Sequence, residues 1–572
     1  MVVKRLLFFQ FLILSINLHA TPIDRATAQL RAEQVLGRAV KAVRSETPRR
    51  APKQGLQTAD AYYVFNADDG QGFAIIAADD AFGTVLGYSS TQAFPVDKSM
   101  PCALQLYLNT FSKAAEIGAR QEAAVEHVVA ATGNQQQLCL TEWGQGVPYN
   151  TLCPKKDGQL CPSGCVATAL AQLLYYWRWP IQGKGYSWAK DGIGETYSGS
   201  LEHEYAWDAM RNTTTENKAS EEASAAVAQL VYDCGLSVNM NYDTDGSGAR
   251  TPIKALCEHF SYIPSTMRMY HAECYTTAEW FDMLRREINQ NRPIYYTATS
   301  LTNGGKDAAG HAFIVDGYDA YGKVHVNWGW DGDFNGYFDL TKMNPGGYQF
   351  TINQAALLGL EPARNGETGT PVEYLLVRTP LSCTQTGTIQ TSVTFDVSVS
   401  NVWNLNGSPH SWQLSLGLFD VTNTMVGEVK TGRVPGLSLD PGYGYNGEFA
   451  SIGCSLKGSY PNGDYAIRLI FRESGTREWL LPDMAGGLKK NAVYVKINGT
   501  RLTFTDGSEY IATAIRDLNS SSLENNDELT RVYDASGRLV YSSPTAHFNL
   551  WDVPARGILV VKQGNNVHKV VR

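Results

Sequence analysis

Hydrophobic and polar positions divide this chain into segments of different period. Residues 26–43 have the spacing of an amphipathic helix, and residues 62–89 form short β-rich runs separated by turn residues at 68–70 and 79–80. Residues 104–131 return to a helical spacing, and a polar stretch of the kind where proteolytic nicking concentrates follows them. We therefore predict an α/β unit over residues 21–132, with a cleavage boundary between residues 119 and 138.

The next segment, residues 133–362, mixes helical and strand patterns. Apolar helical spacing covers residues 165–177, 222–234 and 276–290, and the last of these begins with a capping box formed by Thr276 and Glu279. Strand patterns then dominate, at residues 294–299, 311–317, 324–328 and 336–340. This order predicts an α+β unit in which a helical half and a sheet half are separate.

Alternating patterns continue beyond a polar linker that follows Pro362. They include residues 392–399, 412–419 and 465–471, which predict a β-sandwich of the immunoglobulin-like type over residues 370–500. A last strand-rich segment covers residues 505–572. The fold class is therefore α+β, with an α/β unit before the central unit and β-sandwich-like units after it.

The first 20 residues have the pattern of a secretory signal peptide. Lys4 and Arg5 precede an apolar stretch over residues 6–18, and Ala20 is a small residue at the expected cleavage site. A membrane anchor is the alternative, but the stretch is shorter than the ~20 residues that a spanning helix needs. No later segment is apolar for long enough to span a membrane. We expect an exported protein.

Charge and cysteine content exclude some classes of function. The net charge of −8 and the absence of Lys- or Arg-rich runs argue against a nucleic-acid partner. Ten cysteines in 572 residues are few for a disulfide scaffold. Pairing remains open for two sets, Cys383 with Cys454 and Cys153 with Cys161, whereas Cys234 and Cys257 are expected to be buried free thiols.

Cys165 is the candidate nucleophile. It follows Gly164 and begins an Ala-rich apolar helix, where the first N–H groups and the helix dipole favour a thiolate. Cys161 competes, but it precedes a proline and lacks the helix start. A thiolate nucleophile also needs a base, which His311 can supply from 146 residues further on.

Two strand residues complete the candidate set. Asn327 would accept the second imidazole N–H of His311, and Trp328 would shield that bond from water. His325 is an alternative base, because strand alternation places it on the same face as Asn327. Spacing alone does not decide between His325 and His311.

Four ordered motifs resemble the streptopain family of secreted bacterial cysteine peptidases. They are WGQGVPYN at residues 143–150, GCVATALAQLLYYW at 164–177, GHAFIVDGYD at 310–319 and HVNWGWDGDFNGYFDL at 325–340. The resemblance implies a papain-like peptidase domain over residues 133–362 and selects His311 as the base. It also implies that Gln145 donates to the oxyanion and that Gly310, Trp328 and Trp330 lie at the substrate cleft.

The resemblance extends to both flanks. Residues 62–66, 72–76 and 85–89 are similar to the inhibitory propeptide of that family, which makes residues 21–132 a pro-segment and the chain its own inhibitor. The strand pattern of residues 529–572 is similar to the C-terminal sorting domain of type IX secretion. That likeness implies the type IX machinery as a partner and a final location outside a Gram-negative cell, free or attached to its surface.

No cofactor and no catalytic metal are expected. Asp331 and Asp243 begin loops that resemble EF-hands, but Lys342 and Lys254 stand where each loop needs its bidentate Glu. The sequence thus predicts a latent, secreted cysteine endopeptidase that acts on proteins and is a virulence factor. Two alternatives are a transglutaminase-like acyltransferase and a non-catalytic surface adhesin.

Overall fold

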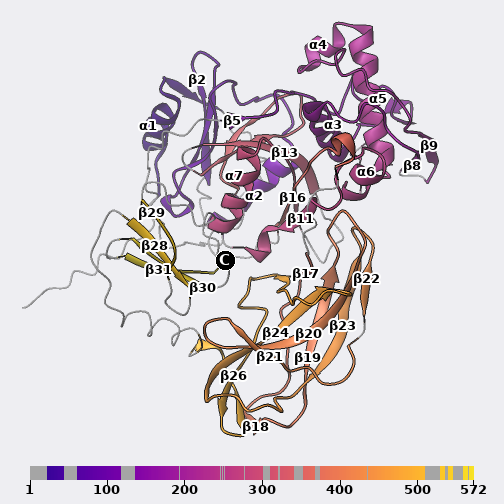
Figure 1. Ribbon diagram of the computed structural model, residues 1–572. Coiled ribbons are helices and arrows are strands. Elements are labelled where there is room, and N and C mark those ends of the chain that lie inside the picture. Colours follow the sequence, from indigo (N-terminus) through magenta and orange to yellow (C-terminus); the bar gives the residue numbers. More distant parts are fainter. Residues whose placement is uncertain are drawn as a thin grey trace, which may run out of the picture. The chain divides into compact units, whose positions relative to one another are not determined.

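The computed structural model describes the chain in several stretches (Figure 1). They are residues 22–43, 61–116, 136–300, 310–340, 352–508, 510, 529–534, 539–544, 558–563 and 566–571, apart from residues 192–193, 245, 248, 250–251, 276, 320–321, 368–373 and 435. The predicted signal peptide, most of the predicted cleavage boundary and the capping residue Thr276 lie outside the described residues. Two compact units result, residues 1–252 with 281–356, and residues 253–280 with 357–572.

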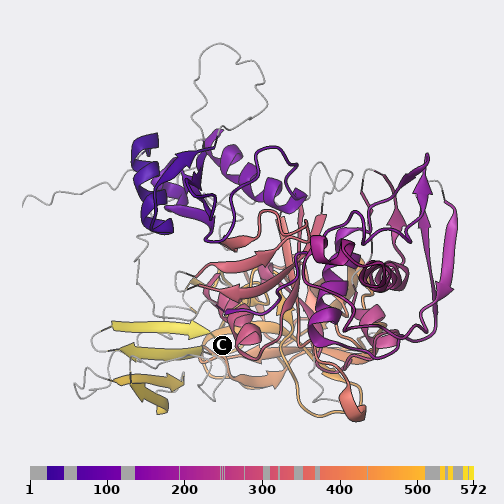
Figure 2. The ribbon, with the colours of Figure 1, turned by 90° about the horizontal axis from the view of Figure 1, so that it is seen from above.

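The first unit begins with a helix on a small sheet. Helix α1 (Arg25–Leu36) starts where the Asp24 side chain accepts a hydrogen bond from the Thr27 N–H at 2.7 Å. It ends at Gly37, whose φ of 65° closes the helix, so the predicted helix over 26–43 stops early and β1 follows. Ala28, Ala32 and Leu36 are buried in one cluster with residues of this sheet. The helix lies beside β2 in Figure 1, and Figure 2 shows the same indigo segment from above.

That sheet is antiparallel and continues into the rest of the unit. Its strands are β1 (Val40–Ala42), β2 (Tyr62–Ala67), β3 (Phe73–Ala77), β4 (Val85–Ser89), β15 (Gly336–Phe338), β14 (Val324–Asn327), β13 (Gly310–Tyr318) and β12 (Ile294–Ser300), in this spatial order. Tyr88 of β4 lies opposite Tyr337 of β15, with their rings stacked at 5.3 Å. The predicted pro-segment and the predicted peptidase therefore share one sheet.

Helices and a second sheet complete the unit. The helices are α2 (Cys102–Glu116), α3 (Cys165–Trp177), α4 (Thr214–Lys218), α5 (Glu221–Ser237) and most of α7 (Thr277–Asn289). The second sheet has the order β10 (Asn241–Tyr242), β8 (Tyr186–Asp191) and β9 (Thr196–Ser200). The unit also has the short strands β5 (Gln136–Gln137), β6 (Lys155–Lys156) and β7 (Gln159–Leu160). The boundary between the first and the second unit falls within β16 (Ile352–Leu358). Helix α3 packs against β13, which brings two distant motifs together.

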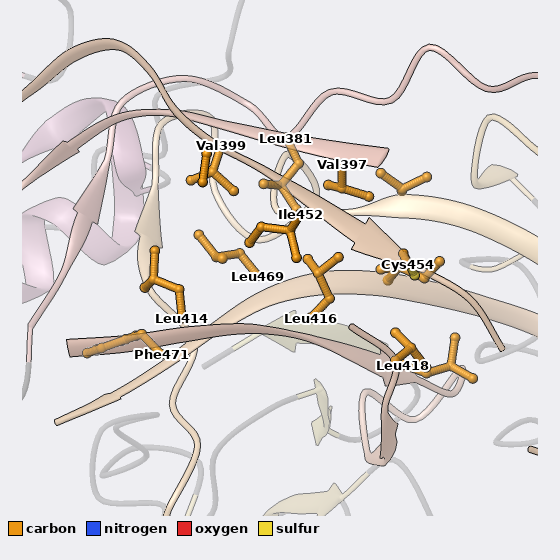
Figure 3. Close-up of a cluster of buried hydrophobic side chains, with 14 of the residues drawn as sticks. Leu381, Val397, Val399, Leu414, Leu416, Leu418, Ile452, Cys454, Leu469 and Phe471 are labelled. Carbon is orange, nitrogen blue, oxygen red and sulfur yellow. The ribbon is translucent and has the colours of Figure 1, made fainter. Parts of the chain in front are cut away.

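The second unit is mostly sheet. One sheet has the order β23 (Gly444–Cys454), β19 (Phe395–Trp403), β17 (Leu376–Val377) and β25 (Asp483–Met484). Another has β18 (Thr388–Gln390), β27 (Arg501–Phe504), β26 (Val493–Asn498), β24 (Gly463–Glu473), β20 (His410–Phe419) and β21 (Met425–Glu428), with β22 (Leu437–Leu439) on β20. Both sheets contribute side chains to one buried hydrophobic cluster, which includes Val397, Ile452, Leu416 and Leu469 (Figure 3).

The remaining elements of this unit include two that lie within the predicted peptidase segment. Helix α6 (Ile253–Glu258) and strand β11 (Arg268–His271) group with it, although the sequence pattern assigned them to the central unit. The last sheet has the order β29 (Leu539–Pro544), β28 (Leu529–Asp534), β30 (Ile558–Gln563) and β31 (Asn566–Val571).

Two further findings concern the whole chain. None of the ten cysteines forms a disulfide in the structure, including both pairs that the sequence left open. Within the described ranges, no helix has the length and apolar character needed to cross a membrane.

Candidate active site

The candidate nucleophile is the first residue of a helix. Cys165 begins α3 directly after Gly164, which has φ 88° and ψ 141°. A side chain at position 164 would meet Met240 at 2.7 Å from its Cε atom, so glycine is needed for space as well as for backbone angle. Thr168 fixes the turn by donating its hydroxyl to the Gly164 carbonyl at 3.1 Å.

Cys165 and His311 lie together. The imidazole and the thiol interact by charge and by a hydrogen bond, and the main-chain N–H of Ala312 also donates to the Cys165 sulfur at 3.4 Å. Helix α3 supplies the cysteine and β13 supplies the histidine, from opposite sides of the same packing contact. The sequence prediction that these two residues meet is thus matched by the geometry.

The contact between Cys165 and His311 shifts the pKa of both side chains. Burial alone would raise the pKa of Cys165, but the charge and hydrogen bond of His311 and the N–H groups of Ala312 and Val166 hold it below its ordinary value. Burial alone would lower the pKa of His311, but the charges and hydrogen bonds of Cys165 and Cys102 together outweigh burial and raise it to about 10. Both shifts favour a thiolate facing an imidazolium, the state that nucleophilic catalysis requires.

The second ring nitrogen of His311 does not meet the predicted partner. Its Nε2–H donates to the main-chain carbonyl of Trp328 at 2.9 Å, so the expected acceptor Asn327 is wrong by one residue. The Asn327 side chain instead accepts from the Gly329 N–H at 3.0 Å and donates to Gln172 at 3.1 Å and to Thr141. Asn327 therefore shapes the turn whose carbonyl holds the imidazole.

The three predicted cleft residues have different surroundings. Trp328 is fully buried, donates its ring N–H to Phe334 at 3.0 Å and packs on Phe313, so its side chain belongs to the core and the cleft assignment is wrong for it. Trp330 is half-buried, with its ring 6.0 Å from that of His311. Gly310 is exposed, directly before His311.

Gln145 lies beside the nucleophile loop. Its main-chain carbonyl accepts from the Ser163 N–H at 3.0 Å, and its side chain is half-buried. This hydrogen bond joins Gln145 to Ser163, which is two positions before Cys165. Gln145 therefore lies near the nucleophile although it is 20 positions earlier in the chain.

The competing residues have other partners. His325 is buried and bonds to Asp316 at 2.6 Å, and the same carboxylate accepts from the Cys139 N–H at 2.8 Å. Cys161 is fully buried, with its carbonyl bonded to the Asn150 side chain at 3.1 Å. These contacts favour His311 and Cys165 over their rivals.

Sequence reasoning missed a set of pro-segment residues at the site. The ring N–H of Trp330 donates to the Ser99 carbonyl at 3.1 Å, and Lys98 pairs with Asp333 at 2.6 Å. The Gln92 side chain donates to the carbonyls of Gly332 and Asn335 at 2.7 and 3.1 Å. Polar side chains in a loop before a helix carry no periodic signal, so nothing in the pattern marked them.

Cys102 also belongs to this set. It is the first residue of α2, and its thiol donates to the Gly310 carbonyl at 3.4 Å and bonds to the His311 side chain. Among the residues that the structure describes, no group of three or more His, Cys, Asp or Glu is arranged to hold a metal ion.

A helix-borne thiolate facing a strand-borne imidazolium defines the site of a cysteine peptidase. The Peptidase C10 family model matches residues 143–338, which include Gln145, Cys165, His311 and Asn327, and the Spi protease inhibitor model matches residues 20–115. Residues 143–338 thus match a C10-type cysteine peptidase, and the segment before them matches a propeptide inhibitor region.

Individual relatives agree with the two family models. Thiol protease/hemagglutinin PrtT of Porphyromonas gingivalis is 31% identical over 62% of this chain and 43% of its own length. Streptopain of Streptococcus pyogenes is 28% identical over 52% of this chain and 80% of its own length. A prointerpain A fragment of Prevotella intermedia is 30% identical, with a TM-score of 0.45, over 55% of this chain and 98% of that structure. The match spans less than half of the first of these relatives.

Proposed function

We propose that this chain is a latent cysteine endopeptidase that hydrolyses proteins outside the cell. The observation that carries the proposal is the contact of Cys165, at the start of α3, with His311 on β13. The papain-like arrangement of a helix facing a sheet supports it. So do the two family models, which cover the pro-segment and the peptidase segment in that order.

The geometry supports acyl transfer through a thioester. The Cys165 thiolate attacks the peptide carbonyl, and the imidazolium of His311 gives its proton to the leaving amine. Water then attacks the thioester while neutral His311 takes its proton. The Trp328 carbonyl keeps the ring in place during both steps, because Nε2–H stays bonded to it.

Gln145 is the candidate donor to the oxyanion, together with the main-chain N–H of Cys165. Its main chain is held against the nucleophile loop through Ser163. Removal of one oxyanion donor typically costs ~3–4 kcal/mol of transition-state stabilisation.

Casein hydrolysis in the presence of a thiol reductant tests the proposal. The full-length chain should release peptides, and Cys165→Ala should release none while keeping its pro-form length. Cys161→Ala is the matched control, because that thiol is four residues away and should be dispensable. Activity of Cys165→Ala close to that of the unaltered chain would reject the assignment.

Latency is the second part of the proposal. The pro-segment extends the peptidase sheet through β4 and β15, and its residues 92–102 contact Trp330, Asp333 and Gly310 at the candidate site. Residues 21–132, added in trans to the processed enzyme, should inhibit it. Binding without any effect on turnover would make the pro-segment a folding aid only.

A transglutaminase-like acyltransferase would use the same Cys–His pair. Product masses after incubation with a peptide and excess amine distinguish the two, since hydrolysis gives a free acid and transfer gives an amide. A non-catalytic adhesin is the remaining alternative, and it requires that the paired thiol and imidazole have no role.

Export in two steps completes the proposal. Residues 1–20 would direct the chain across the inner membrane as a signal peptide, and residues 505–572 would serve the type IX machinery as a sorting domain. Their four-stranded antiparallel sheet and the basic end of the sequence support the second step. The β-rich region of residues 370–500 would be an immunoglobulin-like sandwich.

A further inference from the structure

A second thiol lies against the candidate catalytic histidine. Cys102 is the only cysteine in residues 1–138 of the sequence, and it is placed at the start of α2 with half-buried exposure. Its sulfur reaches the carbonyl of Gly310, the residue before His311, and its side chain bonds to the imidazole. The pro-segment thus delivers a thiol to the reacting groups.

Cys165 contacts the same ring. Since Nε2 of His311 is bonded to the Trp328 carbonyl, Nδ1 is the ring nitrogen left for the thiols. Two sulfur atoms from segments far apart in the sequence therefore meet at one imidazole. They are not joined in the structure, where both cysteines are free.

We propose that Cys102 and Cys165 form a disulfide that locks the pro-segment on the site until a reductant breaks it. This inference rests on the proposed role of Cys165 as nucleophile. The oxidant is a small-molecule disulfide of the glutathione class, and the lock is a covalent addition to the contacts of Gln92, Lys98 and Ser99.

Each step of the exchange balances. The Cys165 thiolate attacks the small disulfide, forms a mixed disulfide and releases one small thiolate, which takes the proton of the His311 imidazolium and leaves as a thiol. The Cys102 thiol then passes its proton to the now neutral His311, attacks the Cys165 sulfur and releases the second small thiolate, which takes that proton from His311. One small disulfide is reduced to two thiols while two protein thiols become one disulfide.

The surroundings of the other cysteines make this pairing selective. Burial raises the pKa of seven of them, so that their thiolates are scarce near neutral pH: Cys139, Cys153, Cys234, Cys257, Cys274, Cys383 and Cys454. The pKa of Cys165 is instead held low by its neighbours, so it reacts first. Cys102 is then the thiol that shares a base with it.

The test uses the full-length chain, treated either with oxidised glutathione or with a phosphine reductant. After free thiols are alkylated, non-reducing digestion and mass spectrometry should identify a peptide that links Cys102 to Cys165 in the oxidised sample only. The oxidised chain should not convert to the processed form until a reductant is added. Cys102→Ser, with Cys102→Ala as a second variant, should give Cys165 as the glutathione mixed disulfide.

Cys257→Ser is the matched control, because the Cys257 thiol likewise donates to a glycine carbonyl, that of Gly407, at 3.4 Å but contacts no candidate catalytic group in any described interaction. It should form the Cys102–Cys165 link as the unaltered chain does. Recovery of Cys165 as the mixed disulfide with Cys102 alkylated in the unaltered chain would overturn the proposal. If the reduced chain fails to cleave casein, the proposed function fails, while the peptide map still decides the disulfide.

Discussion

Gly164 determines where the nucleophile can stand. Its φ of 88° is strained for other residues, and an added Cβ would meet both Met240 and Ser247 within 3.1 Å. Gly164→Ala should therefore destabilise the chain by ~1–3 kcal/mol and slow alkylation of Cys165, as measured by urea unfolding and by mass spectrometry. Gly146→Ala is the control, since nothing lies within 4 Å of its added Cβ. Equal effects of the two substitutions would contradict this account.

Asn327 acts through the turn that it shapes, and its side chain is fully buried. Asn327→Ala leaves buried partners unsatisfied, each at a cost of ~1–3 kcal/mol, and releases the Trp328 carbonyl from its position. We expect lower stability together with a narrower pH range of casein hydrolysis.

Asn404→Ala separates these two effects. Asn404 is also fully buried, donates to Ser408 and Leu439 at 2.9 Å and accepts from Asn406 at 3.0 Å, in the second unit. It should lose stability without any change in the pH profile of the processed enzyme. A shifted profile in Asn404→Ala would show that the readout follows stability alone.

The ion pair predicts how the thiol responds to pH. Thiolate forms as pH rises through the lowered pKa of Cys165, while the contact with the thiolate raises the pKa of His311 and keeps the imidazole protonated. Iodoacetamide should therefore alkylate Cys165 in the processed enzyme at a lower pH than it alkylates an ordinary thiol of pKa ~8.5. His311→Ala should move this reactivity to higher pH, and Cys257, with a pKa raised to about 12, should stay unmodified.

At the scale of elements, local patterns predicted the helix and strands that carry the candidate site. Helix α3 has the bounds predicted from its apolar pattern, β13 extends one residue beyond its predicted range at each end, and β14 ends one residue before its predicted end. Pairing across the chain carries no local signal, so the junction of β4 with β15 was not foreseen. The acceptor for His311 was missed for a similar reason, because a main-chain carbonyl is present at every residue.

The loop before α2 is the element that should control latency. Gln92 makes two hydrogen bonds to carbonyls of the turn after Trp330, at Gly332 and Asn335. At ~0.5–1.5 kcal/mol for each bond, Gln92→Ala should weaken the closed state roughly tenfold. The full-length chain should then reach the processed form correspondingly faster, as followed by gel electrophoresis over time.

Gln71→Ala provides the comparison for that rate. Gln71 is an exposed residue of the turn between β2 and β3, and its main-chain carbonyl accepts from Arg38 at 3.0 Å. This bond survives the substitution, so the rate of processing should not change. If Gln71→Ala accelerates processing as much as Gln92→Ala, the turn contacts are not the latch.

At the scale of the whole molecule, composition and linkers indicated several units but not their membership. Residues 253–280 group with the C-terminal unit, although they stand between segments of the first unit in the sequence. Hydrophobic periodicity predicts that a segment is buried and leaves open which core receives it. The predicted peptidase range, residues 133–362, is one continuous stretch of sequence. Each compact unit instead combines stretches that are separate in the sequence.

The last four strands permit a test of export by deletion. They form a sheet of their own, so removing residues 529–572 takes no strand from the other sheets of the described chain. If the proposed export route holds, the truncated protein should cross the inner membrane and stop in the periplasm, because the proposed signal peptide would serve only the first step. Cell fractionation should find it there, and lysis should release a processed enzyme that cleaves casein. Normal secretion of the truncated protein would make the final sheet an ordinary β-module, whereas an inactive protein in the lysate would show that these strands are needed for folding and not for export.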